Sequence, residues 1–189
     1  MRPHKKLQGK RKKKRKIIIG ENEKAIIRTI GLGSLVIASF ALPGLPVVLK
    51  PIMEMRGSEG FQKLLDQLKN KNIITLGGDE IKLTKRGQKL LEKIEVESIE
   101  IKKPDEWDGI WWLVSYDIPN ELNNMRDYFR ALLKRYGFHQ IQASLWVHPY
   151  DCREEIAIVA QYLDISEFVI IMSTDHLPKQ EDIEQYFNL

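Results

Sequence analysis

Between residues 57 and 94 the hydrophobic positions first follow a helical period and then a strand-like one. Gly57-Ser58 supplies a helix cap, and an amphipathic helix is predicted after it because large apolar side chains recur at spacings of three, one and three: Phe61, Leu64, Leu65 and Leu68. Two short apolar segments, 73–76 and 80–83, are joined by Gly77-Gly78-Asp79, which indicates a β-hairpin. Leu83-Thr84-Lys85-Arg86-Gly87 then leads into a predicted helix over 88–94.

A second pattern begins at residue 110. The apolar run 110–118 lies between Gly109 and Pro119 and is rich in strand-forming residues, which predicts a strand buried on both faces. The later segments are predicted in order as a helix, two strands, a helix and a strand: 120–136, 138–143, 144–148, 151–162 and 168–172. This β-α-β-β-α-β order is the ferredoxin-like arrangement, and its open sheet edges commonly pair with a second copy.

Residues 21–56 permit two interpretations. The first is a buried helix that includes residues 26–42, a Pro-Gly-Leu-Pro turn, and a short second helix over 47–55. The second is a membrane anchor, because residues 29–49 carry no charge and approach the length of a span. Pro43 and Pro46 would break such a helix, so we predict the buried helix and expect no membrane partner. The preceding basic block suits a cytoplasmic flank, which keeps the membrane anchor as the alternative.

Charge is distributed unevenly along the 189 residues, whose net charge is +4. Residues 1–16 carry +10, residues 17–103 carry +3, and residues 104–189 carry −9. The only cysteine, Cys152, excludes an internal disulfide and, without a secretory signal, predicts a reducing, cytoplasmic compartment. The charge asymmetry favours attraction of a polyanion by the N-terminal end.

We therefore predict an α+β protein in three parts. Residues 1–16 form a disordered basic arm, 17–103 a winged helix-turn-helix-like domain, and 104–189 a ferredoxin-like domain. The arm would neutralise DNA phosphates without sequence preference, although a solubilising tail is the alternative. Its candidate DNA-binding side chains form one block: Lys10, Arg11, Lys12, Lys13, Lys14, Arg15 and Lys16.

In the winged-helix interpretation, the helix over 58–70 enters the major groove and the hairpin lies along the DNA backbone. Gln62 and Gln67 offer base-edge chemistry on that helix. Phosphate contacts are expected from the surrounding cations Lys63, Lys69, Lys82, Lys85 and Arg86. The modest charge of this region keeps a second interpretation open, in which the domain contacts another protein.

Four motifs in the second domain resemble a known family. They are Trp107-Asp108-Gly109, Leu113-Val114 through Asp117-Ile118-Pro119, Tyr136-Gly137-Phe138, and Gln142-x-Ser144-x-Trp146-Val147-x-Pro149. Together they look like the central domain of the phenylacetic-acid-type repressors, the PaaX family. That domain is itself similar to the CRISPR-associated Cas-two endonucleases, which have a comparable Tyr-Asp-Ile strand end.

The resemblance implies two functions. The first is a DNA-binding transcriptional regulator without a cofactor, a homodimer held by the ferredoxin-like domain on a roughly palindromic double-stranded site. The alternative is a Mg²⁺-dependent nuclease, in which Asp117 is the catalytic and metal-binding residue and faces its dimer mate.

Several side chains of the second domain have ordinary structural explanations. Asp117 can instead cap the following helix. We interpret His139 and His148 as edge or surface residues, and Cys152 has no paired base that would make it a nucleophile.

Overall fold

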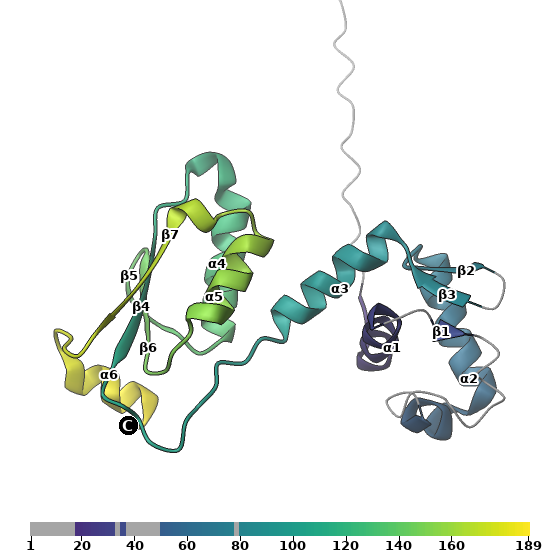
Figure 1. Ribbon diagram of the computed structural model, residues 1–189, viewed down its shortest axis with the longest axis horizontal. Helices are drawn as coiled ribbons and strands as arrows, with labels where there is room; N and C mark the ends of the chain where they lie inside the picture. The colour runs from purple at the N-terminus through teal and green to yellow at the C-terminus, as the bar shows by residue number, and fades with distance from the viewer. Residues whose placement is uncertain (1–17, 33–34, 37–49, 78–79) are drawn as a thin grey trace, which may run out of the picture. The chain divides into compact units, whose positions relative to one another are not determined.

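The computed structural model describes residues 18–32, 35–36, 50–77 and 80–189, and it separates into two compact units, Met1–Gly87 and Gln88–Leu189. The division falls within a helix, whereas the sequence predicts a domain boundary at 103/104. Each unit has its own sheet (Figure 1).

The first unit contains two helices and a small antiparallel sheet. Its elements are α1 (Glu21–Gly31), β1 (Leu35–Val36), α2 (Lys50–Asn70), β2 (Ile74–Gly77) and β3 (Glu80–Leu83). The strand order is β1-β3-β2, so β3 is central. Gly57 interrupts α2 with φ 68° and ψ 173°, a backbone conformation that glycine adopts readily, and α2 is therefore two helical segments on either side of a kink.

The apolar spacing of α2 predicts its buried face correctly. All four side chains of the pattern, Phe61, Leu64, Leu65 and Leu68, are buried. Ile26, Ile27 and Ile30 of α1 are buried as well, as are Ile73, Ile74 and Ile81. At the start of α1, the buried Glu23 carboxylate lies 2.6 Å from the Lys71 ammonium and also accepts the backbone N–H of Gly20 at 2.9 Å.

The prediction of one helix through residue 42 is wrong. Helix α1 ends at Gly31, and Leu35–Val36 instead pair with β3 in the register Leu35↔Ile81 and Val36↔Glu80. Glycines at positions 31 and 33 weaken a helix at this point. Val36, a β-branched residue, suits the strand that follows. The predicted turn at 43–46 and the predicted helix start at 47–49 lie outside the described residues, and α2 is helical from Lys50.

Most of segment 29–49 also lies outside the described residues. Within the part of the chain that the structure describes, none of the helices has the length and apolar character needed to span a bilayer.

The second unit has the predicted β-α-β-β-α-β order. After α3 (Lys85–Glu97) come β4 (Trp111–Tyr116), α4 (Asn123–Arg135), β5 (His139–Gln142), β6 (Leu145–His148), α5 (Arg153–Tyr162), β7 (Val169–Thr174) and α6 (Gln180–Phe187). Single 3₁₀ turns, η2 (Asn120–Leu122) and η3 (Ser166–Phe168), precede α4 and β7. The strand order is β5-β6-β4-β7 and every pairing is antiparallel.

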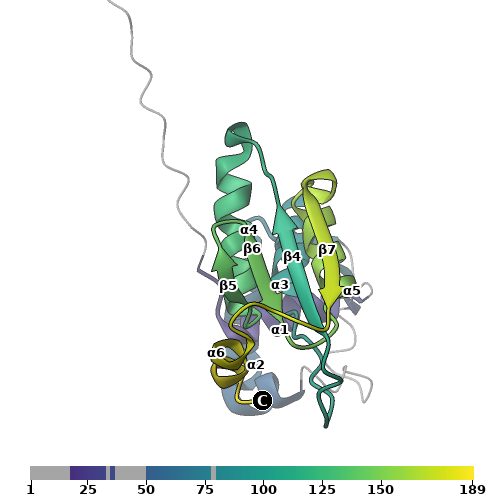
Figure 2. The same ribbon diagram turned by 90° about the vertical axis from the view of Figure 1, so that its left-hand side faces the viewer.

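Helices α4 and α5 cover one face of this sheet, and α6 lies against part of the other face (Figures 1 and 2). Phe129, Leu132 and Val159 pack with Val114 and Trp146 in the larger core. On the opposite face, a smaller core places Ile183 and Phe187 of α6 with Trp111 and Leu113 of β4. Helix α6 lies beyond the last element that the sequence analysis predicts.

Helix α3 extends beyond the predicted range 88–94. It reaches Glu97, so residues 95–97 are helical and only the remainder of the expected linker lies outside a helix. Val96 is buried in the larger core of the second unit, and its carbonyl accepts the Tyr136 hydroxyl at 2.6 Å. These contacts explain why the charged sequence around them is structured.

Candidate nucleic-acid interface

The second segment of α2 presents polar side chains on the side opposite its core face. Gln62 and Lys63 are exposed, and Lys69 is exposed near the end of the helix. Gln67 is also exposed but contributes to a hollow of about 280 Å³, together with Arg56 and the first residues of α1. Gln67 thus differs from Gln62 and Lys63 in that it borders this hollow.

The β2–β3 hairpin carries the next predicted cation. Thr75 pairs with Lys82 in the antiparallel register, and both side chains are exposed. The neighbouring Ile81 is fully buried, so alternation along β3 directs Lys82 away from the core. The tip of the hairpin, residues 78–79, lies outside the described residues.

The start of α3 has an unusual distribution of charge. Lys85 and Arg86 occupy its first turn, are both exposed, and have no acidic residue beside them in that turn. Cations at a helix N-terminus oppose the helix dipole, and they gain nothing there unless an anion also binds. The unpaired N–H groups of a first turn bind phosphate oxygens well, so this position suits a phosphate group.

Thr84 and Gly87 fix this turn against the end of α2. The Thr84 hydroxyl donates to the Asn72 carbonyl at 2.8 Å and accepts the Gly87 N–H at 2.9 Å. A Cβ atom on Gly87 would lie 2.1 Å from the Ile73 carbonyl oxygen, so only glycine permits this approach. The two cations thus sit on a firmly held turn. The arm residues Lys10–Lys16 lie outside the described residues and stay a prediction.

In the second unit, Asp117 is exposed directly after β4. Its backbone N–H donates to the Phe168 carbonyl at 3.0 Å. It lines a hollow of about 410 Å³ with Ser115, Ser144 and Glu167. Neither η2 nor α4 has a side-chain cap, so Asp117 does not take the capping role that the sequence also allowed.

Tyr116, immediately before Asp117, is held by several hydrogen bonds. Its hydroxyl accepts the Arg130 Nε–H at 2.7 Å and the Trp146 Nε1–H at 3.3 Å, and it donates to the Ala143 carbonyl at 3.1 Å. This network fixes the end of β4. Asp117 is thus an exposed carboxylate on a rigid strand end, and no group of three or more His, Cys, Asp or Glu suited to a metal ion occurs in the described part of the chain.

Residues 104–186 match the family model described as the PaaX protein central Cas2-like domain. This part of the chain is therefore similar to the PaaX central, Cas2-like domain. The match confirms the resemblance expected from the four motifs, and it includes the entire four-stranded sheet, Asp117 and most of α6. No curated protein matches the chain.

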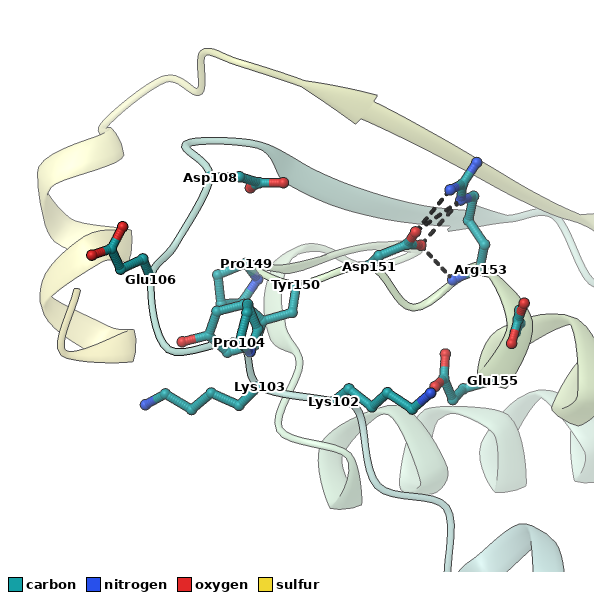
Figure 3. Close-up of a pocket in the computed structure, with 11 residues that line it drawn as sticks. Lys102, Lys103, Pro104, Glu106, Asp108, Pro149, Tyr150, Asp151, Arg153 and Glu155 are labelled. Carbon is teal, nitrogen blue, oxygen red and sulfur yellow. Dashed lines mark hydrogen bonds and ion pairs between the residues drawn. The ribbon is translucent and has the colours of Figure 1, made fainter.

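The Cas2-like domain lies within residues 104–189, the most acidic region of the sequence. A wide hollow at its surface is also lined by more acidic than basic side chains. The hollow, of about 910 Å³, is lined by five carboxylates and three cations, with two prolines and Tyr150: Lys102, Lys103, Pro104, Glu106, Asp108, Pro149, Tyr150, Asp151, Arg153, Glu154 and Glu155 (Figure 3). This excess of negative charge does not suit a nucleic acid, whereas the predicted DNA-contacting cations Lys63, Lys69, Lys82, Lys85 and Arg86 all lie in the first unit.

Arg153 and Asp151 form a fork at the edge of this hollow. Arg153 Nη2 lies 2.8 Å from Asp151 Oδ2, and its Nε lies 3.0 Å from Oδ1 (Figure 3). The Arg153 guanidinium also lies 4.6 Å from the centre of the Trp112 ring. The hydrogen bond from Arg153 lowers the pKa of the Asp151 carboxyl. Asp151 also accepts the backbone N–H of Arg153 at 3.1 Å, which agrees with its predicted place at the start of α5.

His148 of the Cas2-like domain is not the edge or surface residue that the sequence predicts, because it lies on β6, an inner strand of the sheet. Only 6% of it is exposed, and its Nδ1 lies 3.2 Å from the backbone nitrogen of Tyr150. Phe138, Tyr150 and Phe187 surround its ring. Burial lowers the pKa of His148 to about 4, so it is neutral at physiological pH. The Cys152 thiol is buried as well, and desolvation raises its pKa to about 12, so it is an inert core group.

Proposed function

We propose that this protein is a DNA-binding transcriptional regulator of the PaaX type. The observation that carries the proposal is the first turn of α3, where Lys85 and Arg86 oppose the helix dipole on a turn anchored beside a β-hairpin. The PaaX central domain in the same chain supports this assignment independently. Mg²⁺ or another cofactor is not required for this function.

The first unit would act as a winged helix-turn-helix. Helix α1, the kinked α2 and the three-stranded sheet follow the order of such a domain, with Gly57 between two helical segments. The segment 58–70 would enter the major groove, where Gln62 can bind adenine. Lys63, Lys69, Lys82, Lys85 and Arg86 would contact phosphates, and Gln67 would serve at most the edge of the interface.

The basic arm would add affinity without sequence preference. Its seven consecutive cations, Lys10–Lys16, would release counterions from the duplex. Deleting residues 1–16 should therefore flatten the dependence of log affinity on log salt by several units. An unchanged salt dependence would show that the arm does not contact DNA.

Dimerisation would use the part of the sheet that α6 leaves open. Ile170 is 60% exposed and Met172 is 43% exposed, and they lie on β7, the last strand in the sheet order. Met172 pairs with Leu113, so this surface continues from the small core under α6. An antiparallel edge strand is complementary to itself under two-fold symmetry, which makes a second copy the natural partner.

A direct test separates this function from the nuclease alternative. The same purified full-length protein is assayed for duplex binding and for strand cleavage, each with and without Mg²⁺. A regulator binds duplex DNA with strong salt dependence and leaves it intact. Failure to bind duplexes even in dilute buffer would overturn the proposal.

The second candidate function, Mg²⁺-dependent cleavage, relies on Asp117. Its carboxylate is exposed at a rigid strand end and shares a hollow with Glu167, which supports testing Asp117 as a metal-binding residue. Two carboxylates in one copy are few protein ligands for Mg²⁺, so a second subunit would have to supply further ligands. Asp117→Asn should abolish cleavage if this function holds, and it should leave duplex binding by a regulator unchanged.

A further inference from the structure

The outward side of the second α2 segment bears a mixed set of polar groups. Four exposed side chains recur at helical spacing and form what we call the 59–66 stripe: Glu59, Gln62, Lys63 and Asp66. They lie opposite the buried face of the same helix, which Phe61 and Leu65 help to form. Within the described residues, none of the four takes part in a salt bridge or a side-chain hydrogen bond, so they are available to a ligand.

Two of these four groups are acids, which is unexpected on a surface that would meet a polyanion. A carboxylate near phosphates is repelled, and an ionised one can only accept hydrogen bonds. In the major groove, the amino groups of cytosine and adenine are the donors that base edges offer. Adenine places its N7 acceptor beside that amino group, whereas cytosine presents the N4 amino group without a neighbouring acceptor. Cytosine is therefore the base that suits a carboxylate best.

We propose that Glu59 and Asp66 read cytosines in the major groove of the DNA site. This inference rests on the proposed DNA-binding function and adds the base content of the target. Seven residues of helix rise roughly 10 Å, and base pairs stack about 3.4 Å apart along each strand. The two carboxylates would thus meet bases about three positions apart in each half-site, and Gln62 and Lys63 would lie between them.

The same carboxylates would act against other sequences. Guanine and thymine present acceptors at the corresponding positions in the major groove, so a carboxylate facing them loses its water without gaining a hydrogen bond. Rejection of wrong bases is then a larger effect than attraction to the correct one. Replacing the acid with its amide should relax the base preference and also strengthen binding to random duplexes.

The experiment is a selection from randomised duplexes with the full-length protein, followed by affinity measurements on the selected site. Glu59→Gln and Asp66→Asn change the charge and keep the size of each side chain. Glu54→Gln is the matched control, because Glu54 is also exposed on α2 but lies before the Gly57 kink and outside the stripe. All variants are compared at one salt concentration.

The wild type should select cytosine at two positions about three base pairs apart. Replacing one of these cytosines should weaken wild-type binding by roughly 5- to 150-fold. Asp66→Asn should erase that penalty at one position and Glu59→Gln at the other, while Glu54→Gln should preserve both. Wild-type binding without a cytosine preference, or an unchanged preference in both amide variants, would overturn this inference and leave the proposed function standing. A complete lack of duplex binding would overturn both.

Discussion

Removing the two cations at the start of α3 should reduce the salt dependence of DNA binding in a calculable way. Lys85 and Arg86 are exposed in a first helical turn that Thr84 and Gly87 hold in place. The double variant Lys85→Gln/Arg86→Gln keeps a polar side chain at each position and removes two charges. It should also relieve their conflict with the helix dipole, so the fold should be as stable as before or slightly more stable.

The magnitude follows from the number of phosphates lost. Each neutralised phosphate contributes about 0.9 to the slope of log affinity against log salt. Two contacts per subunit therefore correspond to a decrease of about 1.8, and a dimer on two half-sites would lose about 3.6. The loss should be similar for all sequences, since phosphate contacts position the protein without reading bases.

The assay is fluorescence anisotropy with a labelled duplex over a series of salt concentrations. The matched control is Lys102→Gln/Lys103→Gln, which removes two adjacent exposed cations beside the acidic hollow of the second unit. The control should retain the wild-type slope. Equal slopes for the two double variants would show that Lys85 and Arg86 do not contact phosphates.

Three further predictions concern stability. Because burial lowers the pKa of His148 to about 4, below its usual 6.5, the unfolded chain takes up a proton first as the pH falls. The contribution of His148 to the free energy of unfolding should therefore be fully present above pH 6.5 and should decrease by about 3 kcal/mol towards pH 4. Urea titrations of His148→Gln should show less of this decrease than those of an exposed control, His176→Gln. Lys71→Met leaves the Glu23 carboxylate buried without its cation, so urea titrations should give a free energy of unfolding of the first unit that is lower by about 1–3 kcal/mol, with Lys24→Met, at an exposed pair, changing little. Gly87→Ala places a methyl group against the Ile73 carbonyl, so calorimetry should find a lower Tm, whereas Gly77→Ala, which meets nothing within 4 Å, should not.

Local patterns were sufficient to predict most of the second unit. The apolar run 110–118 and the turn at Pro119 contain β4 (Trp111–Tyr116), and the later periodicities place α4 to β7 within a few residues. Gly137 has φ 86°, as expected for a glycine that ends a helix. These elements follow from residues close in sequence, which is why their order and the ferredoxin-like sheet could be derived.

The features that sequence analysis missed depend on contacts between distant residues. Strand β1 forms because Leu35 and Val36 meet β3, more than forty positions later in the chain. The buried ring of His148 packs against Phe187 of α6 as well as Phe138 and Tyr150, and α6 itself was not predicted. The acidic hollow joins residues near 103 with residues near 153, and the charge pattern alone could not bring these two regions together.

The bond between Tyr136 and Val96 has a practical consequence for dissecting the protein. A fragment cut where the family match begins, at residue 104, would leave the Tyr136 hydroxyl without its acceptor and would open the core that Val96 closes. A fragment that starts at Gln88 would retain both. The smallest autonomous piece for expression, or for fusion to another DNA-binding module, is therefore longer than the recognisable family segment.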